Sequence, residues 1–177
     1  MLTMENIFNE IRENGGSTPC RKVNEIAMRF PDKVAFRDKR FGIWSEISYQ
    51  SFWEQAQWVG CALNYFGVDS FNKVAVHSEN RPEWIIADIG IQSIRAISVG
   101  LYPTNPPSEV KYLLEHSETK VLFAEDQEQV DKALEVMNEL PNLKKIIYFE
   151  DRGVVGYKDE ILMSWEEFLA CLLYTSD

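Results

Sequence analysis

Residues 73–101 read KVAVHSENRPEWIIADIGIQSIRAISVGL, and this stretch decides the fold. Its first five residues, 73–77, form a short apolar run that predicts a buried strand. The apolar-rich segment 84–94 has the length of a helix, and residues 96–101 form a second strand-like run. A strand, a helix and a strand in this order predict one crossover unit in which the two strands run parallel.

The start of the central helix carries its own signals. Asn80 and Glu83 stand three residues apart, as in a capping box, and Pro82 falls in the first turn, where proline is favoured. The helix, expected over Trp84–Ile94, is apolar on more than one side. That pattern indicates burial from two directions.

The same alternation continues toward the C-terminus. A helix is expected from about Pro106, followed by strand Val121–Ala124, helix Gln127–Leu140 and strand Lys144–Phe149. Together with the first unit, these segments predict an α/β fold. We expect a doubly wound, mainly parallel sheet with helices on both faces.

Other elements are expected before this sheet. A short helix, Cys20–Phe30, and a β-hairpin of strands Val34–Arg37 and Ile43–Ile47 come first. Ser48 is placed to cap the next helix, which ends at Gly67.

The composition is that of a globular protein. Apolar residues make up 45% and charged residues 26% of the 177 residues. The net charge is -10, and no stretch gathers enough Lys and Arg to neutralise a row of phosphates, so nucleic acid is not expected as a partner. The sequence has no secretory signal and no run of about 18 apolar residues. We therefore expect a soluble, cytoplasmic protein without a transmembrane segment.

The cysteines Cys20, Cys61 and Cys171 lie far apart and form no Cys-x-x-Cys pair. Because His77 and His116 are the only histidines, the sequence supports neither a disulfide framework nor a zinc site. Each cysteine is expected to be a small buried apolar residue.

Open α/β sheets bind ligands in the loops that follow their strands. These loops read HSEN at 77–80, YPTN at 102–105 and ED at 125–126. None has the glycine spacing of a dinucleotide site or of a P-loop. We assign no catalytic, cofactor-binding or metal-ligating residue within the chain.

Single residues in and beside these loops have structural explanations. His77 beside Glu79 could be a base with an orienting carboxylate, but a histidine at a strand end is more often a structural group. Glu125 and Asp126 are expected to stabilise the start of the following helix. Trp84 is expected in the core.

Three segments carry a resemblance to a known family: SENRPEW at 78–84, ADIGIQ at 87–92 and VGLYPT at 99–104. Over these segments, and more weakly over roughly residues 20–170, the chain resembles the AMP-forming (adenylate-forming) acyl-CoA synthetases. The resemblance is strongest to the bacterial long-chain fatty acid–CoA ligase group.

The resemblance implies a two-step ligase. A fatty acid and ATP, with Mg2+, would give an acyl-adenylate and pyrophosphate, and coenzyme A would then form the thioester. The phosphate loop, adenine motif, hinge and C-terminal lysine of such enzymes would lie beyond Asp177. The parent enzyme is therefore expected to bind these small molecules, with peripheral membrane contact allowed, whereas this chain alone is expected to be inactive and to bind no cofactor.

The resemblance also implies a division of the chain. We expect a flexible leader over 1–19, a partial N-terminal AMP-binding (adenylation) domain over 20–170 and a non-native tail over 171–177. The tail contains LYTS at 173–176, which imitates the start of the family's phosphate loop until Asp177 breaks the match. One departure from the family is the pair Arg95-Ala96, where glycine is usual.

Two alternatives stay open. A stand-alone α/β binding or signalling module would have the same alternation of elements, since fold does not fix function. A receiver-type phosphorylation site would need an Asp at one strand end facing a Lys at a later one, and we find no such pair. Within the enzyme class, a peptide-synthetase adenylation domain or a luciferase-like relative is the other alternative.

Overall fold

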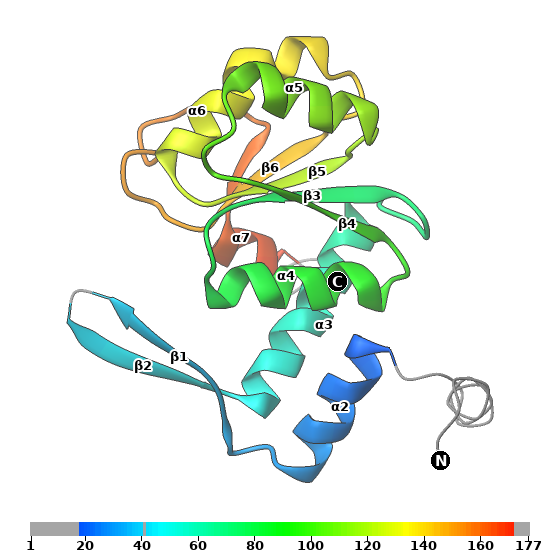
Figure 1. Cartoon of the computed structure of the whole chain (residues 1–177), viewed down its shortest axis with the longest axis vertical. Coiled ribbons are helices and arrows are strands. Elements are labelled where there is room, and N and C mark those ends of the chain that lie inside the picture. Colours follow the sequence, from blue (N-terminus) through cyan, green and yellow to red (C-terminus); the bar gives the residue numbers. More distant parts are fainter. Residues whose placement is uncertain (1–17, 41, 172–177) are drawn as a thin grey trace, which may run out of the picture.

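The computed structural model describes residues 18–40 and 42–171, and its elements follow the predicted order (Figure 1). The helices are α2 (Pro19–Arg29), α3 (Tyr49–Tyr65), α4 (Pro82–Ser93), α5 (Pro107–His116), α6 (Gln127–Val136), the 3-10 turn η1 (Met137–Glu139) and α7 (Trp165–Ala170). The strands are β1 (Val34–Arg40), β2 (Ile43–Ser48), β3 (Lys73–His77), β4 (Ile97–Leu101), β5 (Val121–Ala124), β6 (Lys145–Tyr148) and β7 (Leu162–Ser164). The predictions for residues 1–17 and 172–177 lie outside the described residues.

A five-stranded sheet forms the centre of the fold. Its strand order is β4-β3-β5-β6-β7, and every neighbouring pair is parallel. In register, Ala75 of β3 lies between Val99 of β4 and Leu122 of β5. The four predicted strands are therefore confirmed as parallel, and β7 is an additional strand that the sequence pattern did not indicate.

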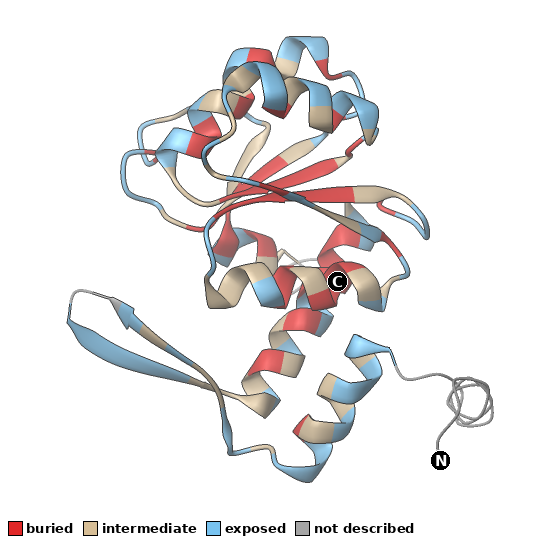
Figure 2. Cartoon of the chain, in the orientation of Figure 1, coloured by how far each residue is buried: buried red, intermediate tan, exposed pale blue. Residues whose placement is uncertain are grey.

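Each face of the sheet carries its own core, because successive side chains of a strand point to opposite faces. Val74, Val76 and Phe123 point to the face covered by α3, α4 and α7, and Ala75 and Leu122 point to the face covered by α5 and α6. Figure 1 places these helices on the two sides of the sheet, and Figure 2 shows the neighbouring strands β3 and β5 between them as almost wholly buried. The doubly wound architecture is confirmed.

Helix α4 is buried from two directions, as its apolar pattern predicted. One side packs on the sheet, and Ile86, Ala87 and Ile91 are fully buried. The other side contacts α3, and α2 also reaches it, where the Cys20 thiol donates a hydrogen bond to the Ile89 carbonyl at 3.4 Å. The described part of the chain therefore supplies both partners of this helix.

The contact between α3 and α4 depends on a glycine. A Cβ at Gly90 would lie 2.5 Å from the Cβ of Val59 and 2.8 Å from the carbonyl oxygen of Ala56, both on α3. Separations under 3 Å are not tolerated, so any side chain at this position would force the two helices apart.

Gly90→Ala is expected to lower the free energy of unfolding by about 2 kcal/mol, because the cost of overpacking exceeds the gain in helix propensity. Urea unfolding followed by circular dichroism measures the change. Gly156→Ala is the matched control, since a Cβ there meets nothing within 4 Å, and its effect is expected within about 0.5 kcal/mol. Equal stability of the two variants would show that the helices can separate without cost.

Helix starts agree with the sequence at some positions and differ at others. The Ser48 hydroxyl accepts the Ser51 N–H at 3.1 Å, as predicted for the cap of α3. The capping box expected at Asn80 and Glu83 is wrong, because α4 begins at Pro82 with Arg81 as the N-cap residue and no side-chain cap bond. A capping box does form at α7, where Ser164 and Glu167 bond each other's backbone N–H.

The hairpin and α2 occupy the other end of the molecule from α5 and α6 (Figure 1). Strands β1 and β2 pair antiparallel as a separate two-stranded sheet, each slightly longer than predicted. Helix α2 begins at Pro19, and the Thr18 hydroxyl accepts the Arg21 N–H, so these two residues of the predicted leader belong to a helix and its cap. No helix among residues 18–40 and 42–171 has the length and apolarity needed to cross a membrane.

Candidate functional site

The carboxyl ends of β3, β4 and β5 meet at one edge of the sheet. If the strands are renumbered in chain order from β3, their order in the sheet is 2-1-3-4-5. The second strand, β4, is therefore added on one side of β3, and β5, β6 and β7 are added in turn on the other side. The direction reverses between β3 and β5, and open α/β sheets place ligands at this switch point. The loops after His77 and after Ala124 border it.

At the switch point, groups of the loops after β3 and β5 bond to each other. Glu125, at the end of β5, accepts the backbone N–H of Glu79 at 2.6 Å, which ties the loop after β3 to the loop after β5. The expected role of Glu125 at a helix start is therefore wrong, because its carboxylate bonds another loop. Asp126 does cap α6, accepting the Glu128 N–H at 2.9 Å.

The Arg81 side chain links the loops that follow β3, β5 and β6. This side chain is only 10% exposed and pairs with Glu83 through two hydrogen bonds, of 2.8 and 3.2 Å. The guanidinium also lies 3.7 Å from a Glu125 oxygen and 3.9 Å from a Glu150 oxygen, and over the ring of Phe149 at 5.3 Å. One cation thus links the ends of β3, β5 and β6, as expected of a buried arginine that is fully paired.

Beside the switch point lies a pocket of about 330 Å³, on the β4 side of β3. Its size is at the lower end for small-molecule sites. The residues that line it are Ser78, Glu79, Asn80, Trp84, Gly100, Leu101, Tyr102 and Pro103.

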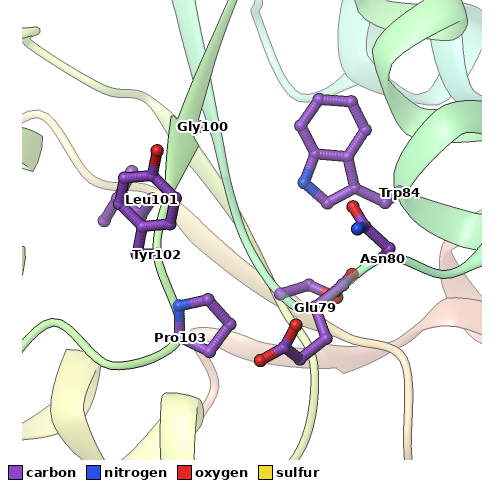
Figure 3. Close-up of a pocket in the computed structure, with 8 residues that line it drawn as sticks. Glu79, Asn80, Trp84, Gly100, Leu101, Tyr102 and Pro103 are labelled. Carbon is purple, nitrogen blue, oxygen red and sulfur yellow. Dashed lines mark hydrogen bonds between the residues drawn. The ribbon is translucent and has the colours of Figure 1, made fainter.

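The pocket has two facing walls, which Figure 3 shows in close-up. Trp84 and Asn80, from the start of α4, stand on one side, and Leu101, Tyr102 and Pro103, from the end of β4, stand on the other. The half-buried indole of Trp84 both packs against the core and lines the pocket, so the expectation of a purely core role for Trp84 is only partly right.

Comparison with known proteins identifies the chain. The sequence profile of the AMP-binding enzyme family matches residues 23–176. The chain belongs to the AMP-binding enzyme family.

Curated members of the family that match the chain are several times longer than it. The long-chain-fatty-acid–CoA ligase ACSBG2 of Xenopus laevis is 30% identical over 145 residues, which are 82% of this chain and 19% of the relative. The long-chain-fatty-acid–CoA ligase FadD15 of Mycobacterium tuberculosis is 28% identical over 123 residues, or 70% of this chain and 20% of the relative. The chain spans about a fifth of the length of these relatives.

Solved structures share the fold. An anthranilate CoA ligase in complex with anthranoyl-AMP superposes with a TM-score of 0.75 at 22% identity, covering 86% of this chain and 27% of that one. The acetoacetyl-CoA synthetase of Streptomyces lividans gives a TM-score of 0.75 at 19% identity, covering 85% and 24%. At these identities the likeness concerns the fold, and it confirms the predicted fold class of the chain.

His77 is buried beneath the pocket. Its Nε2 lies 3.1 Å from the Tyr102 carbonyl oxygen, to which it donates. Burial, and next the positive charge of Lys132, lowers the pKa of the imidazole from 6.5 to about 4. A neutral ring bonded to a backbone carbonyl agrees with the structural interpretation of this histidine, and the hydrogen bond of its ring goes to Tyr102 and not to the suggested partner Glu79.

The candidate site offers polar groups without a metal centre. Among residues 18–40 and 42–171, no three His, Cys, Asp or Glu side chains gather closely enough to hold a metal ion. The pocket presents the Asn80 amide, the Glu79 carboxylate and the Trp84 ring. These groups can contact a small organic molecule, but they do not provide the backbone amides and lysine that cradle a triphosphate.

Proposed function

We propose that this chain is the N-terminal part of an ATP-dependent long-chain fatty acid–CoA ligase. The observation that carries the proposal is the family match over residues 23–176 combined with curated relatives that are long-chain-fatty-acid–CoA ligases. Those relatives extend over about five times the aligned length, so the chain corresponds to one portion of such an enzyme. We further propose that the enzyme acts in the cytoplasm, with peripheral contact to the membrane that holds its substrate.

The proposed reaction has two steps. A carboxylate oxygen of the fatty acid attacks the α-phosphorus of ATP, and pyrophosphate leaves. The sulfur of coenzyme A then attacks the acyl carbon of the adenylate, and AMP leaves. In both steps negative charge develops on oxygen atoms, which such enzymes stabilise with preorganised donors and a cation.

We propose that the chain contributes one side of a site to this reaction and that the groups for the chemistry lie in other parts of the enzyme. The chain's pocket lies at the carboxyl end of the sheet, beside the switch point, between Trp84 and the Tyr102–Pro103 turn. No metal cluster and no glycine-rich phosphate loop occur among the described residues. We propose that Mg2+ and the triphosphate are held by segments that the longer relatives have after the aligned region.

The test compares this chain with the full-length enzyme cloned from the gene that encodes residues 20–170. Each is mixed with ATP, Mg2+ and palmitate, and pyrophosphate release is followed. The longer protein is expected to release pyrophosphate only when palmitate is present, and residues 1–177 are expected to match the no-protein control. Calorimetric titration with ATP is expected to give no saturable binding to residues 1–177 at micromolar concentrations.

Either half of the proposal can fail separately. Palmitate-dependent release by residues 1–177 would place the active site within this chain. A longer protein that activates amino acids or other acids but not palmitate would assign the chain to a different adenylate-forming enzyme.

A further inference from the structure

The wall of the pocket opposite Trp84 is a tight turn at the end of an edge strand. After β4, the Asn105 N–H donates to the Tyr102 carbonyl oxygen at 2.9 Å, which closes the turn. Within the described residues β4 pairs only with β3, so no strand on its outer side supports this turn. The Tyr102 side chain is 79% exposed and gives the turn little packing.

Two side chains from distant elements hold the turn instead. His77, the last residue of β3, donates from Nε2 to the Tyr102 carbonyl oxygen at 3.1 Å. Lys132, on α6, donates from Nζ to the Pro103 carbonyl oxygen at 2.7 Å. Two consecutive carbonyls of the pocket wall are therefore bonded from beneath by donors that lie 25 and 29 residues away in sequence.

The burial of these donors indicates a fixed arrangement. His77 is fully buried, and the side chain of Lys132 is 15% exposed while also pairing with Glu128 at 2.6 Å. A lysine on a surface helix ordinarily keeps its ammonium in water, and ordering the side chain costs rotamer entropy. A charge-assisted bond to a carbonyl is one of the stronger hydrogen bonds available to offset that cost.

We propose that His77 and Lys132 are positioning residues that fix the Tyr102–Pro103 turn as one wall of the pocket. Neither side chain lines the pocket, so both act through the backbone of the turn. The two carbonyls point toward the donors, and this orientation keeps Pro103 and the Tyr102 backbone facing Trp84. The relevance of the wall to ligand binding rests on the proposed function, whereas the clamp itself does not.

Hydrogen exchange of the 177-residue chain tests the clamp directly. The peptide 102–107 contains three prolines, which have no amide hydrogen. Apart from its first residue, Tyr102, only Thr104 and Asn105 therefore contribute to its exchange. Loss of one charge-assisted bond to the turn in Lys132→Met is expected to raise the exchange rate of this peptide about tenfold. His77→Phe, which keeps the ring and loses the donor, is expected to do the same, and Lys132→Arg to restore most of the protection.

Lys111→Met is the matched control. Lys111 is also a partly buried lysine on a helix and is paired across elements, with Glu139, but it does not contact the turn. Its variant is expected to leave the exchange of peptide 102–107 unchanged. Exchange of peptides from the buried strand β5 reports global unfolding. If Lys132→Met raises exchange in these peptides as well, the variant is unfolded, and Lys132→Gln is used in its place. Unchanged exchange of peptide 102–107 in folded variants at both positions would overturn the proposal.

A second measurement uses the full-length enzyme cloned from the gene that encodes residues 20–170. Loosening the wall is expected to raise the KM of the substrate that contacts the pocket by about tenfold, with kcat changed less than about twofold. Lys132→Met is expected to raise KM in this way, whereas Lys132→Arg, which keeps a donor for the Pro103 carbonyl, is expected to leave KM near the wild-type value. Unaltered KM values for ATP, fatty acid and coenzyme A in Lys132→Met would overturn the role in binding. If the longer protein shows no ligase activity at all, the proposed function fails, and the exchange experiment still decides the clamp.

Discussion

Phe123→Ala is expected to lower the free energy of unfolding by about 3–5 kcal/mol. Phe123 lies at the middle of β5 and is fully buried. Its ring centroid is 5.9 Å from that of Phe149, 5.9 Å from Trp165 and 5.4 Å from Phe168. Truncation would leave a cavity between the sheet and α7 and would also remove these edge and stacked contacts.

Chemical denaturation followed by circular dichroism and by tryptophan fluorescence measures this loss. Trp165 belongs to the cluster, so the fluorescence is expected to change together with the far-ultraviolet signal. Tyr112→Ala is the matched control, because Tyr112 is an aromatic side chain that is 62% exposed, and its cost is expected to stay below about 1 kcal/mol. A cost below about 1 kcal/mol for Phe123→Ala as well would mean that α7 does not form one core with the sheet.

The sequence predicted the central sheet because its strands and helices have strong and distinct patterns. Strands of four or five apolar residues separated by helices of ten or more allow only a parallel arrangement with crossovers. Strand β7 was missed because it has only three residues, Leu162–Ser164, too few to show an alternation. Helix α6 was predicted too long because Met137–Glu139 tighten into a 3-10 turn before Pro141, and residue pattern does not separate the two helix types.

The error at the start of α4 has a physical cause. The pattern at Asn80 and Glu83 fits a capping box, yet Pro82 occupies the first helical position and moves the cap to Arg81. The Glu83 carboxylate then pairs with the Arg81 guanidinium instead of a backbone N–H. Pro82 and the ion pair of Glu83 with Arg81 therefore prevent the capping box that the sequence pattern predicted.

The sequence analysis assigned no site residue, although it named the loops that follow the strands as the place to look for one. Five residues of two of these loops line the pocket: Ser78, Glu79, Asn80, Tyr102 and Pro103. How the pocket is built was not predictable. The contacts that shape these loops join residues far apart in sequence, such as Glu125 with the Glu79 N–H and Lys132 with the Pro103 carbonyl. No local pattern marks Lys132, which reads as an ordinary i,i+4 partner of Glu128 on a helix surface.

Acidification is expected to destabilise the chain through His77. Its pKa in the folded protein, about 4, lies below the ordinary value of 6.5 because the ring is buried and Lys132 is near. The hydrogen bond to the Tyr102 carbonyl and the charges of Glu128 and Asp126 act in the opposite direction and do not cancel this lowering. Between these two pKa values the unfolded chain binds a proton that the folded chain does not. The contribution of His77 to stability is therefore complete above about pH 6.5 and is lost as the pH falls toward 4.

At about 1.4 kcal/mol for each pH unit between the two pKa values, the loss amounts to about 3 kcal/mol. Urea unfolding of the wild type and of His77→Phe at pH 7 and pH 4 isolates the contribution of His77 to the free energy of unfolding. Both proteins carry the same carboxylates, so the pH dependence that these cause cancels in the difference between them. At pH 7 the variant is expected to be the less stable protein, since it lacks the bond to the Tyr102 carbonyl. At pH 4 the difference is expected to have moved by about 3 kcal/mol in favour of the variant, because phenylalanine takes up no proton in the unfolded state. A difference that stays constant between the two pH values would mean that the folded imidazole protonates as readily as the unfolded one, and so that His77 is not held neutral beneath the pocket.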